Sequence, residues 1–96
     1  MRRTPFRSSR AGPMSLSIRT LFFAAYRDLL GTSELAVELA EGATVGDLVV
    51  DLRERGAPFD ALPERPAVAV NRTYASADVT LGHGDEVAFI PPVAGG

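Results

Sequence analysis

The sequence has 96 residues, of which 46% are hydrophobic and 23% charged, a composition that predicts one globular domain. It contains no cysteine and no lysine, because all ten basic residues are arginine. These absences exclude disulfides, thiolate nucleophiles, thiolate metal sites and lysine Schiff bases, and the single histidine, His83, excludes a histidine cluster. No apolar run approaches the roughly 18 residues needed to span a bilayer, so we expect a soluble, cytoplasmic protein.

Charge is unevenly distributed along the chain. Residues 14–96 carry six arginines against all twelve acidic residues, a net charge of −6. An acidic body argues against nucleic-acid binding and favours a basic partner surface. Residues 1–13 lack apolar periodicity and the apolar region of a signal peptide, so we expect a disordered or non-native arm there and a single domain over 14–96. The arm holds the other four arginines: Arg2, Arg3, Arg7 and Arg10.

The first part of the domain predicts two strands joined by a long loop. Residues 17–24 are rich in β-favouring residues, and residues 34–40 alternate apolar and polar side chains, so we expect a hairpin. Between them, residues 26–30 fit one helical turn closed by Gly31. In the first strand we expect one face to carry Ile18, Thr20, Phe22 and Ala24 and the other to carry Arg19, Leu21 and Phe23.

The strongest helix signal follows this hairpin. Thr44 is a natural N-cap with Asp47 three residues later, a capping-box pattern with Asp in place of Glu. Gly56 is expected to end the helix at its C′ position. The apolar stripe, which should face the sheet, consists of Val45, Leu48, Val49 and Leu52.

The rest of the domain predicts a loop and further short strands. We expect a loop over 58–66 held to the core by Phe59 and Leu62, and strands over 67–71, 73–77 and 86–90. The predicted fold is therefore α+β, a β-grasp (ubiquitin-like) roll with a mixed sheet of four to five strands and one main helix on one face. Its uncovered face is predicted to be apolar and to offer a docking surface formed by Leu21, Phe23, Ala69, Ala88 and Ile90.

The final residues are the candidate functional segment. Pro91 and Pro92 cannot continue a β-ladder, so the last strand must end before them. Residues 93–96, if extended, reach about 13 Å at about 3.3 Å per residue, enough to carry a terminal carboxylate into a partner's pocket. Gly95 and Gly96 have no Cβ and could enter a narrow tunnel.

Three stretches of the chain resemble a known family. They are Leu21-Phe22-Phe23-Ala24-Ala25-Tyr26-Arg27-Asp28-Leu29-Leu30-Gly31, Ala69-Val70-Asn71-Arg72-Thr73 and Gly84 through Pro91-Pro92-Val93-Ala94-Gly95-Gly96. This pattern is similar to that of the molybdopterin synthase small subunits, ubiquitin-like sulfur carriers of the MoaD/ThiS family. The last motif is the most specific, because a strand running into Pro-Pro-Val-x-Gly-Gly is rarer than Gly-Gly alone.

The resemblance implies a sulfur-carrier function in molybdenum cofactor biosynthesis. Gly96 would be adenylated by an E1-like enzyme that uses ATP, converted to a thiocarboxylate by a sulfur donor, and threaded into the large synthase subunit, where sulfur passes to a cyclic pyranopterin precursor. The chain would be the sulfur-donating subunit of a sulfurtransferase, a heterotetramer whose catalytic groups lie on the large subunit, with no tightly bound cofactor or metal. The resemblance also implies a tail formed by Pro91, Pro92, Val93, Ala94, Gly95 and Gly96, and partner contacts at Phe23, Arg27, Tyr74 and Ile90.

Other interpretations remain open at the level of sequence. A sulfur carrier for thiazole, cysteine or tRNA thiolation, and a ubiquitin-like protein modifier, would both use Gly96. His83 lies in a Gly-His-Gly turn and is expected to be a solvated loop residue rather than a general base. The acidic pairs are expected to be structural or solvated rather than catalytic: Asp47 with Asp51, and Asp85 with Glu86.

Overall fold

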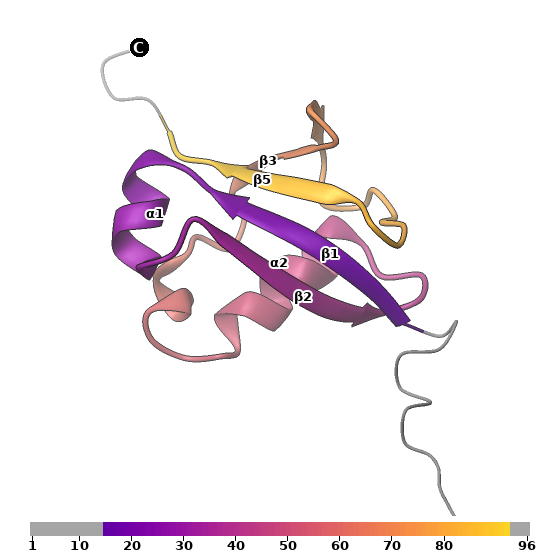
Figure 1. Cartoon of the computed structure of the whole chain (residues 1–96), viewed down its shortest axis with the longest axis horizontal. Coiled ribbons are helices and arrows are strands. Elements are labelled where there is room, and N and C mark those ends of the chain that lie inside the picture. The colour runs from indigo at the N-terminus through magenta and orange to yellow at the C-terminus, as the bar shows by residue number, and fades with distance from the viewer. Residues whose placement is uncertain (1–14, 93–96) are drawn as a thin grey trace, which may run out of the picture.

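The structure is a computed structural model that describes residues 15–92. Five strands form one mixed sheet in the order β2-β1-β5-β3-β4, and α2 packs across one of its faces (Figure 1). The strands are β1 (Ser15–Phe22), β2 (Glu34–Ala40), β3 (Ala67–Val70), β4 (Thr73–Ala75) and β5 (Glu86–Ile90), and the helices are α1 (Ala24–Leu30), α2 (Val45–Arg53) and the 3₁₀ helix η2 (Phe59–Ala61). The predicted α+β β-grasp roll is confirmed.

The pairing of the central strands decides where the chain emerges from the sheet. β1 pairs with β2 antiparallel and with β5 parallel, whereas β3 pairs antiparallel with both β5 and β4. The last strand in sequence is therefore the middle strand in space. Because β1 and β5 are parallel, their carboxyl ends lie at the same end of the sheet.

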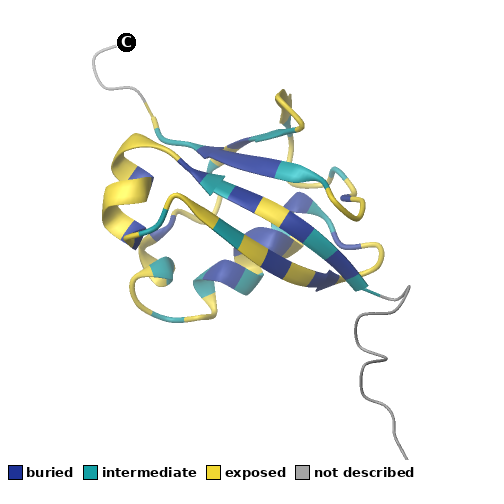
Figure 2. Cartoon of the chain, in the orientation of Figure 1, coloured by how far each residue is buried: buried dark blue, intermediate teal, exposed yellow. Residues whose placement is uncertain are grey.

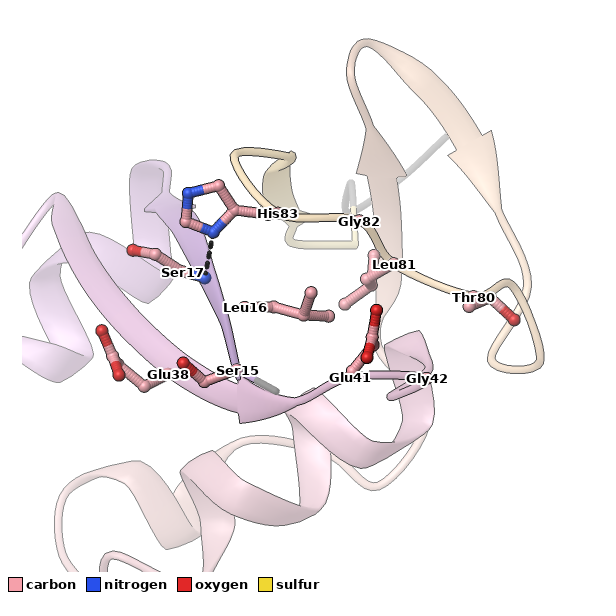
Figure 3. A pocket seen from close by; sticks show the side chains of 10 residues that line it. All are labelled: Ser15, Leu16, Ser17, Glu38, Glu41, Gly42, Thr80, Leu81, Gly82 and His83. Atoms are coloured by element: carbon pink, nitrogen blue, oxygen red, sulfur yellow. Dashed lines mark hydrogen bonds between the residues drawn. The ribbon is translucent and has the colours of Figure 1, made fainter. Parts of the chain in front are cut away.

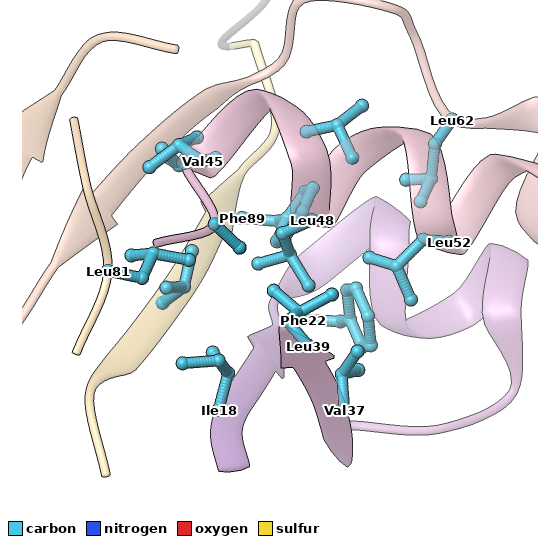
Figure 4. Close-up of a cluster of buried hydrophobic side chains, with 14 of the residues drawn as sticks. Ile18, Phe22, Val37, Leu39, Val45, Leu48, Leu52, Leu62, Leu81 and Phe89 are labelled. Carbon is cyan, nitrogen blue, oxygen red and sulfur yellow. The ribbon is translucent and has the colours of Figure 1, made fainter. Parts of the chain in front are cut away.

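The predicted alternation of faces is confirmed within the observed strands, whereas Ala24 lies outside β1. Figure 2 shows the alternation of buried and exposed residues along β1 and β2. The core-facing side chains include Ile18 and Phe22 of β1, Val68 of β3, and Val87 and Phe89 of β5, while Ala88 is buried on the outer face. Figure 4 shows these side chains gathered between the helix and the sheet. At their centre the ring centroids of Phe22 and Phe89 lie 5.4 Å apart. Thr20, on the same face of β1 as Phe22, is fully buried with no hydrogen-bond partner for its hydroxyl among residues 15–92.

The start of α2 follows from its capping box. The Asp47 N–H donates to Thr44 Oγ1 (3.2 Å) and the Thr44 N–H donates to Asp47 Oδ2 (2.9 Å), so two otherwise unpaired backbone donors are satisfied. The predicted C-terminal position is wrong, because the helix ends at Arg53 with Glu54 as its cap. Gly56, at φ 85°, follows two residues later and is not the residue at C′.

Three other predicted boundaries also need correction. β1 ends at Phe22, because Ala24 has φ 48° and the Tyr26 N–H donates to the Phe23 carbonyl, so Ala24 does not lie on a strand face and instead begins α1. Gly31 closes α1 in the left-handed region, as predicted. β3 and β4 are shorter than predicted, since Asn71 and Arg72 both have positive φ and form a two-residue turn between them.

Candidate functional site

The tail begins where β5 ends. The backbone pairing of β5 stops at Ile90, opposite Ala67 of β3, and Pro91 and Pro92 then leave the sheet (Figure 1). This is the predicted effect of two residues that lack an N–H donor. Gly96, the candidate sulfur-carrying residue, and the tail residues Gly95, Ala94 and Val93 lie outside the described residues.

Phe23 and Arg27 lie at the same end of the sheet as the tail. The parallel β1–β5 pairing ends with Phe22 opposite Phe89. Phe23 and Ile90 directly follow these two residues, so they lie at the same end of the sheet. Phe23 is 46% exposed although it is a large apolar side chain, because β1 has ended and α1 is only beginning there. Arg27 is exposed on α1, and its Nε lies 4.0 Å from Asp28 Oδ1.

The outer face of the sheet carries an apolar row across four strands, β1, β5, β3 and β4. The register places Leu21 opposite Ala88, Ala88 opposite Ala69, and Ala69 opposite Tyr74. Tyr74 is 72% exposed at the outer end of this row. The register confirms the predicted placement of Leu21, Ala69, Ala88 and Ile90 on one face, but Ala88 is buried and Phe23, predicted to share this face, lies beyond the end of β1.

A pocket of about 400 Å³ lies at the base of the tail. It brings together Tyr74 and Ile90, two of the four predicted contact residues, and excludes the other two, Phe23 and Arg27, from its lining. Sequence reasoning missed Tyr26 and the loop that precedes β3, because only the fold places them beside the end of β5. The lining consists of Tyr26, Pro63, Arg65, Pro66, Ala67, Tyr74, Ile90, Pro91 and Pro92.

Two side chains have shifted pKa values: Tyr26, which lines this pocket, and Glu34, which lies on the outer face of the sheet. Burial raises the pKa of the Tyr26 hydroxyl, so Tyr26 is neutral at physiological pH. On the exposed outer face, Arg19 Nε lies 2.9 Å from Glu34 Oε2 and Arg19 Nη1 lies 3.3 Å from Glu86 Oε1. The hydrogen bond and charge of Arg19 lower the pKa of Glu34, which keeps this carboxylate ionised.

His83 and Asp85, two of the polar residues considered as catalytic candidates, lie at the opposite end of the sheet, where a larger hollow of about 820 Å³ opens (Figure 3). There the Ser17 N–H donates to Nδ1 of the exposed His83 (3.0 Å), while Asp85 accepts hydrogen bonds from the Gly82 N–H (2.7 Å) and from Asn71 Nδ2 (3.0 Å). On α2, Asp51 pairs with Arg55 one helical turn away. His83 is exposed, as expected for a solvated loop residue, and Asp85 holds the turn before β5 in place.

Within residues 15–92 no group of three or more histidine or acidic side chains is arranged to hold a metal ion. None of the helices in the same range has the length and apolar character required to cross a bilayer.

The five-stranded mixed sheet with its carboxyl-terminal strand at the centre, and α2 packed on one face, define a ubiquitin-like β-grasp protein. The ThiS family matches residues 20–96, and the chain belongs to this family. The molybdopterin synthase sulfur carrier subunits of Mycobacterium tuberculosis and Escherichia coli are 39% and 41% identical to it, covering 84% and 82% of this chain and 99% of each relative.

Solved structures agree with this assignment. A putative molybdopterin converting factor subunit 1 from Pyrococcus furiosus superposes with a TM-score of 0.69 at 32% identity, covering 81% of this chain and 99% of that one. A chain from the complex of subunits 1 and 2 of the molybdopterin-converting factor of Helicobacter pylori, at 18% identity, has the same fold with a TM-score of 0.61 over 84% of this chain and 100% of that one.

Proposed function

We propose that this protein is the sulfur-carrying small subunit of a molybdopterin synthase, acting in molybdenum cofactor biosynthesis. The observation that carries the proposal is the position of the tail. It leaves the central strand through Pro91 and Pro92 at the end of the sheet where Phe23 and Tyr74 expose large apolar surfaces. The relatives that are about 40% identical over nearly their whole length bear the name of this function.

The reactive group is the terminal carboxylate of Gly96. A carboxylate is a poor acylating agent, so an E1-like enzyme first joins it to the α-phosphate of ATP, releasing pyrophosphate and leaving AMP as a good leaving group. A persulfide sulfur from the donor then attacks the carbonyl carbon and displaces AMP. A second thiol then attacks the donor's sulfur in the resulting acyl disulfide, forming a disulfide with the donor and releasing the thiocarboxylate on Gly96. The absence of cysteine from this chain is no obstacle, because the sulfur is carried on the terminus.

The remaining groups belong to partner proteins. The tail, Val93 to Gly96, enters the large synthase subunit, which supplies the catalytic acids, bases and substrate-binding groups in a heterotetramer. The Helicobacter pylori protein forms a complex of subunits 1 and 2, which supports a large-subunit partner of this kind. Phe23, Arg27, Tyr74 and Ile90 are proposed to contact this partner, and Pro91 and Pro92 to direct the tail away from the sheet.

Intact-protein mass spectrometry tests the first step. After incubation with an E1-like adenylating enzyme, ATP and a sulfur source, Gly96 should exchange one oxygen for one sulfur. Incubation without ATP is the control and should leave the mass unchanged. A chain that keeps its mass under the complete conditions would contradict any sulfur-carrier function, including one in another pathway.

The second step assigns the pathway. The thiocarboxylated protein and the large synthase subunit should convert the cyclic pyranopterin precursor to molybdopterin. Thiocarboxylation without this conversion would indicate a carrier for thiazole, cysteine or tRNA thiolation instead. Isolation of Gly96 joined to lysine side chains of other proteins would indicate a modifier.

A further inference from the structure

The pocket at the base of the tail contains one charged side chain in an otherwise largely apolar lining. Among the lining residues within 15–92, prolines, tyrosines, Ala67 and Ile90 form most of the wall, and Arg65 is the only ionic one. Arg65 is exposed and lies in the loop between η2 and β3, which the sheet brings beside the end of β5 because Ala67 pairs with Ile90. A partner that covers the base of the tail would therefore come close to Arg65.

Arg65 also differs from most other arginines in this part of the chain. Arg19, Arg27, Arg53 and Arg55 each lie within 4.0 Å of an acidic side chain. Within residues 15–92, Arg65 and Arg72 take part in no such ion pair. Glu64, the acidic neighbour of Arg65 in sequence, lies 3.7 Å from Arg53 instead.

Closure of this surface by a partner would remove water from Arg65. A guanidinium cannot lose its proton at physiological pH, so it must either stay hydrated or gain an anionic partner. A carboxylate offers two oxygens that match the planar fork of the guanidinium and form charge-assisted hydrogen bonds. A purely apolar side chain in the pocket would leave the cation uncompensated.

We infer that Arg65 is a specificity-determining residue of the tail-binding interface, and that the pocket at the base of the tail receives an aspartate or glutamate side chain of the large synthase subunit. The carboxylate pairs with the Arg65 guanidinium, and the apolar neighbours of that residue on the partner pack against Ile90 and the prolines. The inference rests on the proposed function, since it takes the large subunit as the protein that holds the tail. It extends the contact surface to a loop that neither the sequence pattern nor the exposed apolar row indicates.

Binding of the full chain to the large synthase subunit by isothermal titration calorimetry tests this inference. Arg65→Gln should weaken binding about tenfold and Arg65→Glu further, since loss of one member of a desolvated ion pair leaves the other unpaired. The difference between the wild type and Arg65→Gln should shrink as salt is raised. Unchanged unfolding midpoints would show that the variants retain the fold.

Arg72 provides the matched control. It is also exposed and in no ion pair within residues 15–92, but it lies in the β3–β4 turn, at the end of the sheet away from the tail, where the adjacent Asn71 N–H donates to the Glu86 carbonyl. Arg72→Glu makes the same change in net charge and should alter the affinity less than about twofold, as expected for a charge outside the interface. Equal losses for both variants would show a general charge effect and overturn the inference.

A charge-reversal experiment identifies the partner residue. In the background of Arg65→Glu, acidic residues of the large subunit are changed to arginine one at a time, and one of these changes should restore most of the affinity. Failure of every reversal, or wild-type affinity for Arg65→Glu, would overturn the pairing. A defect confined to adenylation would overturn it too, by placing Arg65 at the activating enzyme instead. Absence of binding by the wild type would refute the proposed function itself, so the two failures are distinguishable.

Discussion

The two ends of the sheet differ in the kind of side chain they expose. At the turn end, Asp85, Asn71 and His83 form hydrogen bonds to the backbone or to one another and hold the β3–β4 and β4–β5 connections in place. At the tail end, Phe23, Tyr74 and Ile90 are apolar or aromatic and have little of the protein packed over them. The residue types usually associated with catalysis therefore lie at the structural end. The end proposed to act in sulfur transfer offers a contact surface and a tail.

The largest effect is expected from a change at the tail itself. Adding one alanine after Gly96 moves the carboxylate past the point at which the activating enzyme binds it, so thiocarboxylate formation should fall by more than about 100-fold, since small misplacements of a reacting group cost rate factors of this size. Mass spectrometry after reaction with the adenylating enzyme measures this. The unfolding midpoint should not change. Full activity of the extended chain would refute the assignment of the reactive group.

A smaller effect is expected from placing a charge on the contact surface. Ile90→Asp should weaken binding of the large subunit about 30-fold, because it buries an unpaired carboxylate in an apolar interface. Phe23→Ala should weaken it about tenfold through lost apolar contact. Ala40→Asp, on the exposed outer side of β2 near the turn end, is the control and should leave the affinity measured by titration calorimetry unchanged. If Ile90→Asp binds with wild-type affinity, this face of the sheet does not contact the large subunit.

A substitution at the turn end should lower the stability of the fold and leave partner binding unchanged. Asp85→Ala removes the acceptor for the Gly82 N–H and the Asn71 amide, so it should lower the free energy of unfolding by about 1–3 kcal/mol. Affinity for the partner should be unchanged at temperatures where the variant is folded. Denaturant titration and calorimetry measure the two quantities, and a loss of affinity without a loss of stability would show that this end also contacts the partner.

Thr20 lies between the two ends and tests the core that connects them. Its hydroxyl is buried without a hydrogen-bond partner among residues 15–92, so Thr20→Val should raise the free energy of unfolding by about 1 kcal/mol. Denaturant titration measures the change. Destabilisation by this near-isosteric substitution would mean that the hydroxyl is satisfied by a group such as a buried water.

The smallest effect concerns Tyr26 at the tail end. Its pKa is raised by burial, so the folded state holds the phenolic proton more tightly than the unfolded state. This contribution is fully present below the unfolded-state pKa of about 10 and is lost as the pH rises through the folded-state value. The stability of the wild type should therefore decline above about pH 10 more steeply than that of Tyr26→Phe. An equal decline of stability with pH in the wild type and in Tyr26→Phe would contradict this prediction.

Local patterns were enough to predict much of the fold. The alternation in β2 and β5 located both strands, and Thr44 with Asp47 located the start of α2, because these signals depend on neighbouring residues. Ala24 was misplaced because the apolar run continues past Phe22, whereas the backbone turns into α1 at Ala24, whose φ is 48°. Arg65 was missed because its place beside the tail depends on a long-range contact, the pairing of Ala67 with Ile90.

The central position of β5 has a consequence for protein synthesis. Without this strand, β1–β2 and β3–β4 remain two separate hairpins that share no neighbour, and isolated hairpins are at best marginally stable. A nascent chain therefore cannot close its sheet until Glu86–Ile90 has left the ribosome, immediately ahead of the tail. A product truncated before this strand lacks both the tail and a stable fold. Such a chain is largely unfolded, and unfolded chains are substrates for cellular proteases.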